Sequence, residues 1–176
     1  MNVILVGYRG TGKSTIAREL SRTLNMPRVS FDEELQLRAN LSIREIVANN
    51  GWEHFRDLEQ ALVAEYAQSS GRILDCGGGV VERPQNTAVL RAAGTVIWLA
   101  ASVDTIVRRI SGNSERPALT SNMTFTEEVE SVLRRRTPLY QNLAHVRIST
   151  DVAAPTAIVR QILSLWPHST ASRELQ

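Results

Sequence analysis

The feature that most constrains the fold is a glycine-rich turn between a short apolar run and an amphipathic segment. Residues 7–15 read GYRGTGKST and fit the pattern G-x-x-x-x-G-K-[ST]. Residues 3–6 before it have the length of a buried strand, and residues 14–24 after it carry apolar side chains at helical spacing. This order predicts a loop whose backbone N–H groups, together with the helix N-terminus, bind phosphate.

Several positions of this loop have a chemical role in binding a nucleotide. Lys13 would reach the β- and γ-phosphates, and the hydroxyl of Ser14 would bind Mg²⁺. The alternative is an ordinary strand–turn–helix connection, but turn chemistry alone does not require Lys-Ser after the last glycine. We therefore expect ATP as co-substrate and Mg²⁺ as cofactor. The predicted nucleotide-binding residues of the loop are Gly10, Thr11, Gly12, Lys13, Ser14 and Thr15.

A phosphate loop identifies the nucleotide and leaves the acceptor open. GTP-binding proteins, ATPases and small-molecule kinases share it. The chain has 176 residues and lacks the guanine-reading sequence Asn-Lys-x-Asp. Both observations favour a small-molecule kinase.

The alternation of short apolar runs with amphipathic stretches predicts an α/β protein. After the first strand, the expected strands are residues 28–31, 73–75, 96–99 and 146–148. The expected helices are residues 14–24, 43–47, 53–68, 84–91, 102–110, 124–136 and 155–165, two of them with capping boxes (Ser42 with Glu45, Thr124 with Glu127). Five strands separated by helices indicate a five-stranded parallel sheet between two helical layers, with ligands beyond the carboxyl ends of the strands.

Composition narrows the class of protein further. Lys and Arg number 20 against 18 Asp and Glu, and a net charge of +2 argues against a general nucleic-acid binder. Since no apolar run approaches the roughly 20 residues that span a bilayer, we expect no membrane association. The single cysteine, Cys76, excludes an internal disulfide and fits a reducing compartment. We expect a cytoplasmic monomer with one domain over residues 1–168 and a disordered tail at 169–176.

The remaining motifs resemble the shikimate kinase family. They are Asp32 after the second expected strand, Phe55-Arg56 with Glu59 on a helix, Gly77-Gly78-Gly79 after the third strand, and Arg116-Pro117 with Arg136. The resemblance covers nearly the whole chain, with the motifs in the family's order and spacing. It implies a three-layer fold like that of the nucleoside-monophosphate kinases, with an acceptor-binding insert at about 32–60 and a lid at about 111–123. It also implies ATP-dependent phosphorylation of the 3-hydroxyl of shikimate, a step of aromatic amino acid biosynthesis.

The residue types fit such an acceptor, which carries one carboxylate and three hydroxyls. The guanidinium groups of Arg56 and Arg136 could hold the carboxylate, and Glu59 could hold Arg56 in place. Asp32 could accept from the ring hydroxyls and orient or deprotonate the attacking one. The resemblance implies that Asp32, Arg56, Gly78 and Arg136 bind shikimate, with Gly77 and Gly79 beside them and Phe55 in support. The N–H groups of Gly78 and Gly79 could approach the ring closely.

Arg116 lies in the polar stretch that resembles the family's lid. The resemblance implies that it closes over the nucleotide and neutralises charge on the transferring phosphoryl group. With Lys13 and Asp32 it completes the predicted catalytic set. The alternative is an ordinary surface loop.

Each acceptor motif also has a plain structural interpretation when taken alone. Arg56 could be a solvated arginine, and Asp32 could cap a helix. The glycine triplet could be a bare turn. Residues 134–136, all arginine, could be an exposed basic end of a helix. Together, at the family's spacing, these alternatives become improbable.

Two positions depart from the family's pattern. The family usually carries Asp-x-Asp after the second strand, and here Ser30 stands where the first Asp, which helps to hold Mg²⁺, is expected. Because the third strand ends in Asp75, we hypothesise that this residue supplies the missing carboxylate; the alternative is a structural residue satisfied by nearby N–H groups. Near the C-terminus, Ala153-Ala154-Pro155 replaces an Arg-containing loop that flanks adenine, which puts base selectivity in doubt.

Two rival functions remain open at this point. One is a kinase for another small hydroxylated carboxylic acid, since two arginines still require an anionic acceptor. The other is a catalytically silent nucleotide-binding module, which the loss of the usual first Asp favours and the presence of Lys13, Asp32 and Arg116 disfavours.

Overall fold

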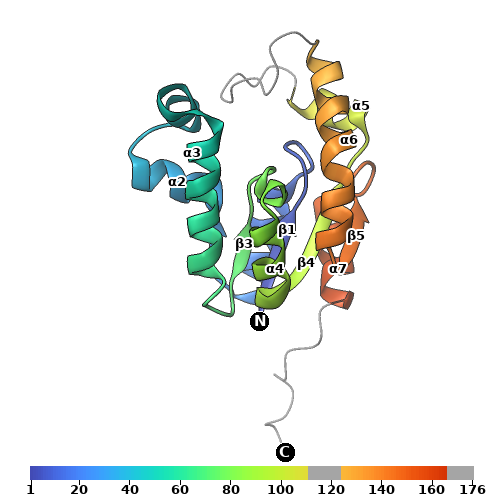
Figure 1. Ribbon diagram of the computed structural model, residues 1–176. Helices are drawn as coiled ribbons and strands as arrows, with labels where there is room; N and C mark the ends of the chain where they lie inside the picture. Colours follow the sequence, from blue (N-terminus) through green and yellow to red (C-terminus); the bar gives the residue numbers. More distant parts are fainter. Residues whose placement is uncertain (111–123, 166–176) are drawn as a thin grey trace, which may run out of the picture.

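A five-stranded, all-parallel sheet forms the centre of the protein. The computed structural model describes residues 1–110 and 124–165 (Figure 1). The strands are β1 (Asn2–Val6), β2 (Arg28–Ser30), β3 (Ile73–Asp75), β4 (Gly94–Ala100) and β5 (Val146–Ser149). They lie in the order β2-β3-β1-β4-β5. The predicted α/β class and the five-stranded parallel sheet are therefore confirmed.

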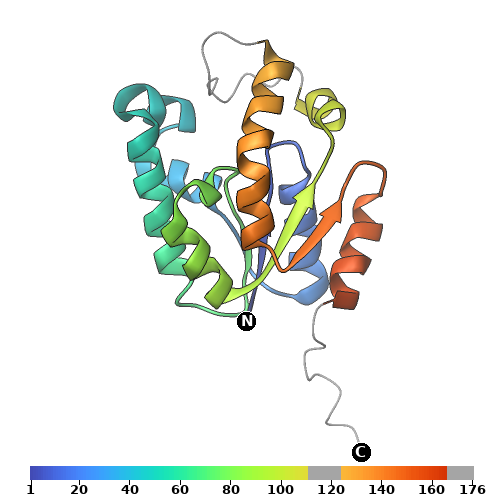
Figure 2. The same cartoon turned by 45° about the vertical axis from the view of Figure 1, so that its right-hand side comes forward.

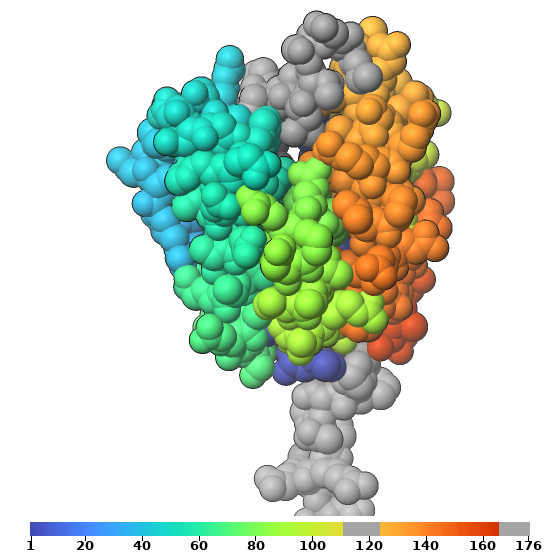
Figure 3. All heavy atoms as spheres, viewed as in Figure 1, coloured from blue at the N-terminus to red at the C-terminus, as the bar shows by residue number. Residues whose placement is uncertain are grey.

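Helices cover both faces of this sheet, as Figure 2 shows. The helices are α1 (Lys13–Leu24), α2 (Phe31–Ala39), α3 (Ile43–Tyr66), α4 (Pro84–Ala93), α5 (Val103–Ile110), α6 (Phe125–Leu143) and α7 (Pro155–Leu165), with a short 3₁₀ helix η1 (Val80–Glu82). Helices α1 and α7 pack together on one face, and α3, α4 and α6 lie side by side on the other (Figures 2 and 3).

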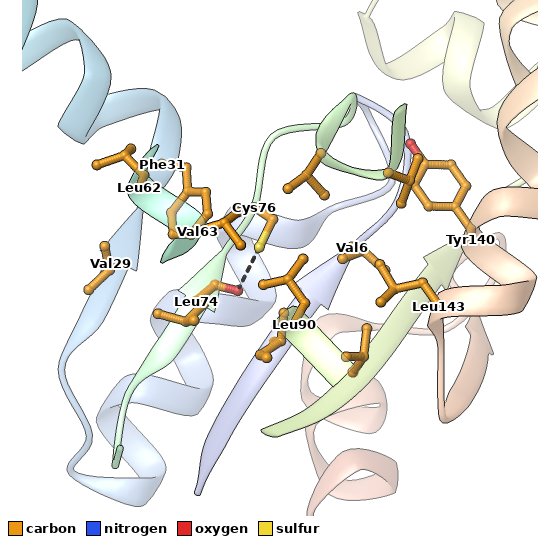
Figure 4. Packing of buried hydrophobic residues seen from close by; sticks show 14 of the residues in the cluster. Val6, Val29, Phe31, Leu62, Val63, Leu74, Cys76, Leu90, Tyr140 and Leu143 are labelled. Atoms are coloured by element: carbon orange, nitrogen blue, oxygen red, sulfur yellow. Dashed lines mark hydrogen bonds between the residues drawn. The ribbon is translucent and has the colours of Figure 1, made fainter. Parts of the chain in front are cut away.

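The side chains of β1 point alternately to the two faces of the sheet, so this one strand contributes to two hydrophobic cores. All five of its residues are buried, as expected for a central parallel strand. Val3 and Leu5 pack with α1 and α7, whereas Ile4 and Val6 point to the opposite core. Figure 4 shows that opposite core, in which Val6 lies between Leu90 of α4 and Leu143 of α6. Cys76 is buried in the same cluster, and burial raises the pKa of its thiol.

The sheet order brings three distant segments to one edge. Strand β3 lies between β2 and β1, and Asp75 is paired in register with Ser30 and with Leu5. The phosphate loop follows β1, α2 follows β2, and the glycine triplet follows β3. Because parallel strands end on the same side, all three segments meet at the carboxyl edge.

Two helices differ from the sequence-based expectation. Helix α2 was not expected; it begins at Phe31, so the second strand ends at Ser30, whose side chain accepts a hydrogen bond from the N–H of Glu33 and caps the helix. Only Phe31 and Leu35 of α2 are buried, so the helix has a weak apolar periodicity. Helix α6 continues through Pro138 to Leu143, well beyond the expected end at Arg136.

The two helices expected at 43–47 and 53–68 are present as the two halves of α3. They are separated at Gly51, whose backbone is not helical.

The local start signals of several helices are confirmed. Both capping boxes form, at Ser42 with Glu45 and at Thr124 with Glu127. Pro84 occupies the first turn of α4. Among the described residues, the structure contains no helix with the length and apolar character needed to cross a bilayer.

A histidine joins the last strand to its neighbour and predicts a pH dependence of stability. The backbone N–H of His145 donates to the carbonyl of Val96 (2.9 Å), and its Nδ1 accepts the Val96 N–H (3.0 Å). Burial, and then the charge of Arg91, lower the pKa of His145. The unfolded chain therefore takes up a proton on His145 near pH 6.5, whereas the folded protein takes it up only at lower pH. The contribution of His145 to the stability of the folded state is present above about pH 6.5 and is lost as the pH falls below it.

We expect His145→Gln to flatten the decrease in thermal stability that the wild type shows between pH 7.5 and 5.5. A glutamine oxygen can still accept the Val96 N–H but does not titrate. The measurement is the melting temperature across this range, with the exposed His54→Gln as control. A wild-type pH slope that His145→Gln leaves unchanged would contradict the assignment.

Candidate active site

Two adjoining cavities lie at the carboxyl edge of the sheet. The first, of about 310 Å³, is lined mainly by the phosphate loop. The second, of about 30 Å³, is lined by α3, the glycine triplet and Arg136. Arg9, Asp32 and Gly78 line both cavities. A nucleotide phosphate in the first cavity and an acceptor molecule in the second would meet at this shared wall.

The phosphate loop has the backbone that its glycines allow. Gly10 and Gly12 have φ values of 80° and 88°, in the left-handed region that favours glycine. At Gly7, a Cβ atom would lie 2.3 Å from the carbonyl oxygen of Leu99. The Nζ of Lys13 donates to the carbonyl of Tyr8 at 3.0 Å, inside the loop. Lys13, Ser14 and Thr15 line the first cavity with Gly10 and Gly12, whereas Thr11 is buried and donates to the Tyr8 carbonyl.

A buried ion pair forms one wall of the second cavity. The Nη1 of Arg56 lies 2.7 Å from Oε2 of Glu59, one turn later on α3. Arg56 is 7% exposed and Glu59 is fully buried. The rings of Trp52 and Phe55 each lie 5.3 Å from the guanidinium carbon of Arg56. The interpretation of Arg56 as a solvated surface arginine is therefore wrong.

Glu59 lines this cavity, and its two carboxylate oxygens have different surroundings. Burial raises the pKa of Glu59, and the neighbouring Arg56 opposes that rise. Its second oxygen, Oε1, is buried and makes no hydrogen bond with any residue in the described part of the chain. A buried acceptor without a partner is costly, so this atom is suited to receive a hydroxyl or a water.

The glycine triplet provides the space in which this ion pair lies. A Cβ atom on Gly77 would lie 2.3 Å from Oε1 of Glu59, and one on Gly79 would lie 2.1–2.3 Å from the guanidinium of Arg56. At Gly78 the nearest atom is 3.4 Å away, which is ordinary contact. The triplet is thus more than a bare turn. This reason for the triplet was not predicted, because nothing in the neighbouring sequence indicates which side chains pack against it.

Arg136 faces Arg56 from helix α6. It is 3% exposed, and its guanidinium carbon lies 5.9 Å from the centre of the Tyr8 ring. Its Nη1 lies near Gly78, 3.6 Å from an ideal Cβ position there. The alternative of an exposed basic helix end is wrong, because α6 continues to Leu143. Arg134 and Arg135 are exposed, whereas Arg136 is buried.

Asp32 lies in the first turn of α2 rather than at its N-cap. Ser30 caps the helix, so the alternative role proposed for Asp32 is wrong. Asp32 lines both cavities, and its Oδ1 lies 3.4 Å from an ideal Cβ position on Gly77. It is therefore the described carboxylate best placed between a phosphate and an acceptor hydroxyl.

Asp75 lines the first cavity but has a cation partner. Its Oδ2 accepts from Nη2 of Arg28 at 2.8 Å and from Nε at 3.3 Å, and its side chain is 4% exposed. Arg28 also contacts Glu33 of α2. The guanidinium N–H groups of Arg28 thus satisfy Asp75, which fits the alternative of a structural residue satisfied by nearby N–H groups. Arg28 was not predicted as the partner, because only the sheet pairing brings it to Asp75.

Three further residues at the site were not predicted. Arg9, at a variable position of the loop motif, lines both cavities and contacts Glu128 of α6 at 2.9 Å. Glu82 contacts Arg56 and Arg136. The hydroxyl of Tyr140 donates to the carbonyl of Gly78. The predicted Arg116 and the predicted lid at 111–123 lie outside the described residues, as does the tail at 169–176.

Comparison with known proteins identifies the family. A sequence model described as shikimate kinase matches residues 9–166. The chain belongs to the shikimate kinase family. A family member from Rhodopirellula baltica is 35% identical over 99% of this chain and 95% of its own. One from Pseudomonas savastanoi pv. phaseolicola is 39% identical over 93% and 94% of the two chains.

Solved structures agree with this assignment. The shikimate kinase of Acinetobacter baumannii, determined in complex with shikimate, has a TM-score of 0.89 at 29% identity and covers 93% of this chain. That comparison covers 91% of the Acinetobacter chain. The shikimate kinase of Aquifex aeolicus has a TM-score of 0.79 at 25% identity, over 94% and 95% of the two chains. A gluconokinase from Sinorhizobium meliloti, at 13% identity and a TM-score of 0.55, shares the fold alone.

Gly79 allows a test of this geometry. We expect Gly79→Ala to displace the Arg56 guanidinium and to lower kcat/KM for the acceptor about fivefold or more, since overpacking a buried site costs about 1–3 kcal/mol. Steady-state kinetics with each substrate varied in turn provide the measurement, and the melting temperature shows whether the variant is folded. An unchanged kcat/KM for the acceptor would contradict the role assigned to Gly79.

Proposed function

We propose that this member of the family transfers the γ-phosphoryl group of ATP to the 3-hydroxyl of shikimate. The observation that carries the proposal is the pair Arg56 and Arg136, which lines a small cavity sharing Asp32 with the phosphate-loop cavity. Two buried guanidinium groups suit one carboxylate, and nearby carboxylate oxygens suit several hydroxyls.

The acceptor would enter the second cavity with its carboxylate toward the arginines. Its volume of about 30 Å³ has room for a water or two, so binding requires the walls to separate. The break at Gly51, just before Trp52 on the cavity wall, gives α3 a place to bend. Oε1 of Glu59 would then accept a ring hydroxyl or a bridging water.

The reacting hydroxyl would lie against Asp32. A carboxylate in this position can orient the hydroxyl and accept its proton as the oxygen attacks the γ-phosphorus. Lys13 would turn from the Tyr8 carbonyl to the β- and γ-phosphates, where its charge stabilises the transition state. Arg116 stays a predicted third participant.

The phosphate-loop cavity has the donor set that Mg²⁺ prefers. Ser14, Asp32 and Asp75 all line it, and hydroxyl and carboxylate oxygens are ligands of this hard cation. We propose Ser14 and Asp75 as the residues that would hold Mg²⁺, which when bound would neutralise charge on the phosphates. The Arg28 pair holds the Asp75 carboxylate beside the cavity.

The test of the function is shikimate-dependent release of ADP from ATP in the presence of Mg²⁺. We expect turnover that requires shikimate and falls at least about a hundredfold in Lys13→Ala, because that variant loses a charge on the transferring group. Quinate, offered as a competing acceptor, separates shikimate from other hydroxylated acids. ATP binding without turnover would favour the silent nucleotide-binding module, and preferential turnover of quinate would favour the other kinase.

The Mg²⁺ assignment has its own test. We expect Asp75→Asn to raise the Mg²⁺ concentration needed for half-maximal turnover about tenfold, because a carboxylate is lost from the donor set. Ser30→Ala removes a helix cap and should change the Mg²⁺ requirement little. Melting temperatures of both variants control for loss of the Arg28 pair. Equal and mild effects on the Mg²⁺ requirement would contradict the role of Asp75.

We also propose that the enzyme works as a monomer in the cytoplasm. The single buried thiol of Cys76 fits a reducing compartment such as the cytoplasm. Size-exclusion chromatography with light scattering measures the oligomeric state directly.

A further inference from the structure

Glu82, the last residue of η1, contacts the arginines on both sides of the acceptor cavity. Its Oε2 lies 3.1 Å from Nε of Arg56, and its Oε1 accepts a hydrogen bond of 3.1 Å from Nε of Arg136. Arg56 belongs to α3 and Arg136 to α6, so one carboxylate joins two walls of the cavity. At the surface Oε1 also contacts Arg135, which is largely exposed.

The contacts of Glu82 leave the cavity side of both arginines to a ligand. Glu82 binds the Nε edge of each guanidinium and is not among the residues that line the cavity. Nη1 of Arg136 lies on the cavity side beside Gly78, and Nη2 of Arg56 lies beside Gly79. Glu82 therefore supports the two arginines from behind and does not occupy the place of the ligand's carboxylate.

Arg136 depends on this support more than Arg56 does. Arg56 is also held by Glu59 and by two aromatic rings, whereas Arg136 contacts the Tyr8 ring and Tyr140. Among the described residues, Glu82 is the acidic partner that forms an ion pair with Arg136. Glu59 lines the same cavity as Arg136, and its Oε1 makes no hydrogen bond with any described residue, so it could attract Arg136 if Glu82 were removed. Arg136 would then turn toward Glu59, into the space of the acceptor.

A second effect of Glu82 opposes the first. Its negative charge repels a ligand carboxylate on the far side of the same guanidinium groups. The side chain of Glu82 is 23% exposed and also contacts Arg135, so solvent and a third cation screen this repulsion. The loss of a buried arginine's position is not screened in this way, so we expect positioning to outweigh repulsion.

We propose that Glu82 is a positioning residue that holds Arg56 and Arg136 at the separation at which both bind one acceptor carboxylate. The inference rests on the proposed function, since it requires an acceptor with a carboxylate. It adds a residue of η1 to the determinants of acceptor specificity.

The experiment compares Glu82→Ala and Glu82→Gln with the wild type. We expect Glu82→Ala to raise KM for shikimate about tenfold, while kcat and KM for ATP change less than about twofold, because ground-state binding of the acceptor is what is lost. Glu82→Gln should lie between the two, since its amide oxygen can still accept from one Nε. Glu53→Gln is the matched control: Glu53 contacts the surface residue Arg83 and neither acceptor arginine.

A second substrate separates positioning from a general loss of structure. The methyl ester of shikimate has no carboxylate for the two arginines to hold, so the wild type should use it with a much lower kcat/KM. We expect Glu82→Ala to cause little further loss with the ester. Melting temperatures of the variants show whether they are folded.

Three outcomes would overturn the inference. The first is an unchanged or lowered KM for shikimate in Glu82→Ala, which would mean that repulsion outweighs positioning. The second is an equal loss with shikimate and with its ester, which would indicate a merely structural role. The third is a wild type without shikimate turnover, which would overturn the proposed function as well. An active wild type with an unaffected variant overturns only the role of Glu82.

Discussion

The buried ion pair of Arg56 and Glu59 is the interaction on which the proposed acceptor site depends. Taking two charges out of water is costly, and removing one partner of such a pair costs about 3–5 kcal/mol. The pair therefore requires space without side chains, which Gly77 and Gly79 provide, and aromatic walls, which Trp52 and Phe55 provide. The two glycines and the two aromatic residues lie apart in the sequence, yet all four accommodate the same buried ion pair.

The sheet order explains how this pair comes to lie beside a phosphate loop. Strand β3 lies between β2 and β1, so the glycine triplet ends up next to both the loop and Asp32. The acceptor and the nucleotide cavities then share a wall at Asp32 and Gly78. In a parallel sheet this adjacency follows from topology alone, and the site needs no long loop to form it.

Local patterns predicted much of this fold and part of the site. The phosphate loop, the five strands and both capping boxes depend on short-range signals, and they were predictable. Helix α2 was missed because its periodicity is weak, and α6 was expected to end too early although it continues through Pro138. Arg28 and Glu82 were missed for another reason: their partners are remote in sequence, and only the folded sheet brings them together.

The central claim is that Arg56 and Arg136 together bind the carboxylate of the acceptor. A crystal structure of this protein with shikimate and ADP tests it most directly. The account predicts one carboxylate with oxygen atoms about 2.7–2.9 Å from Nη atoms of both arginines, with Glu82 still on their Nε edges. A shikimate carboxylate bound elsewhere, or held by neither arginine, would contradict it.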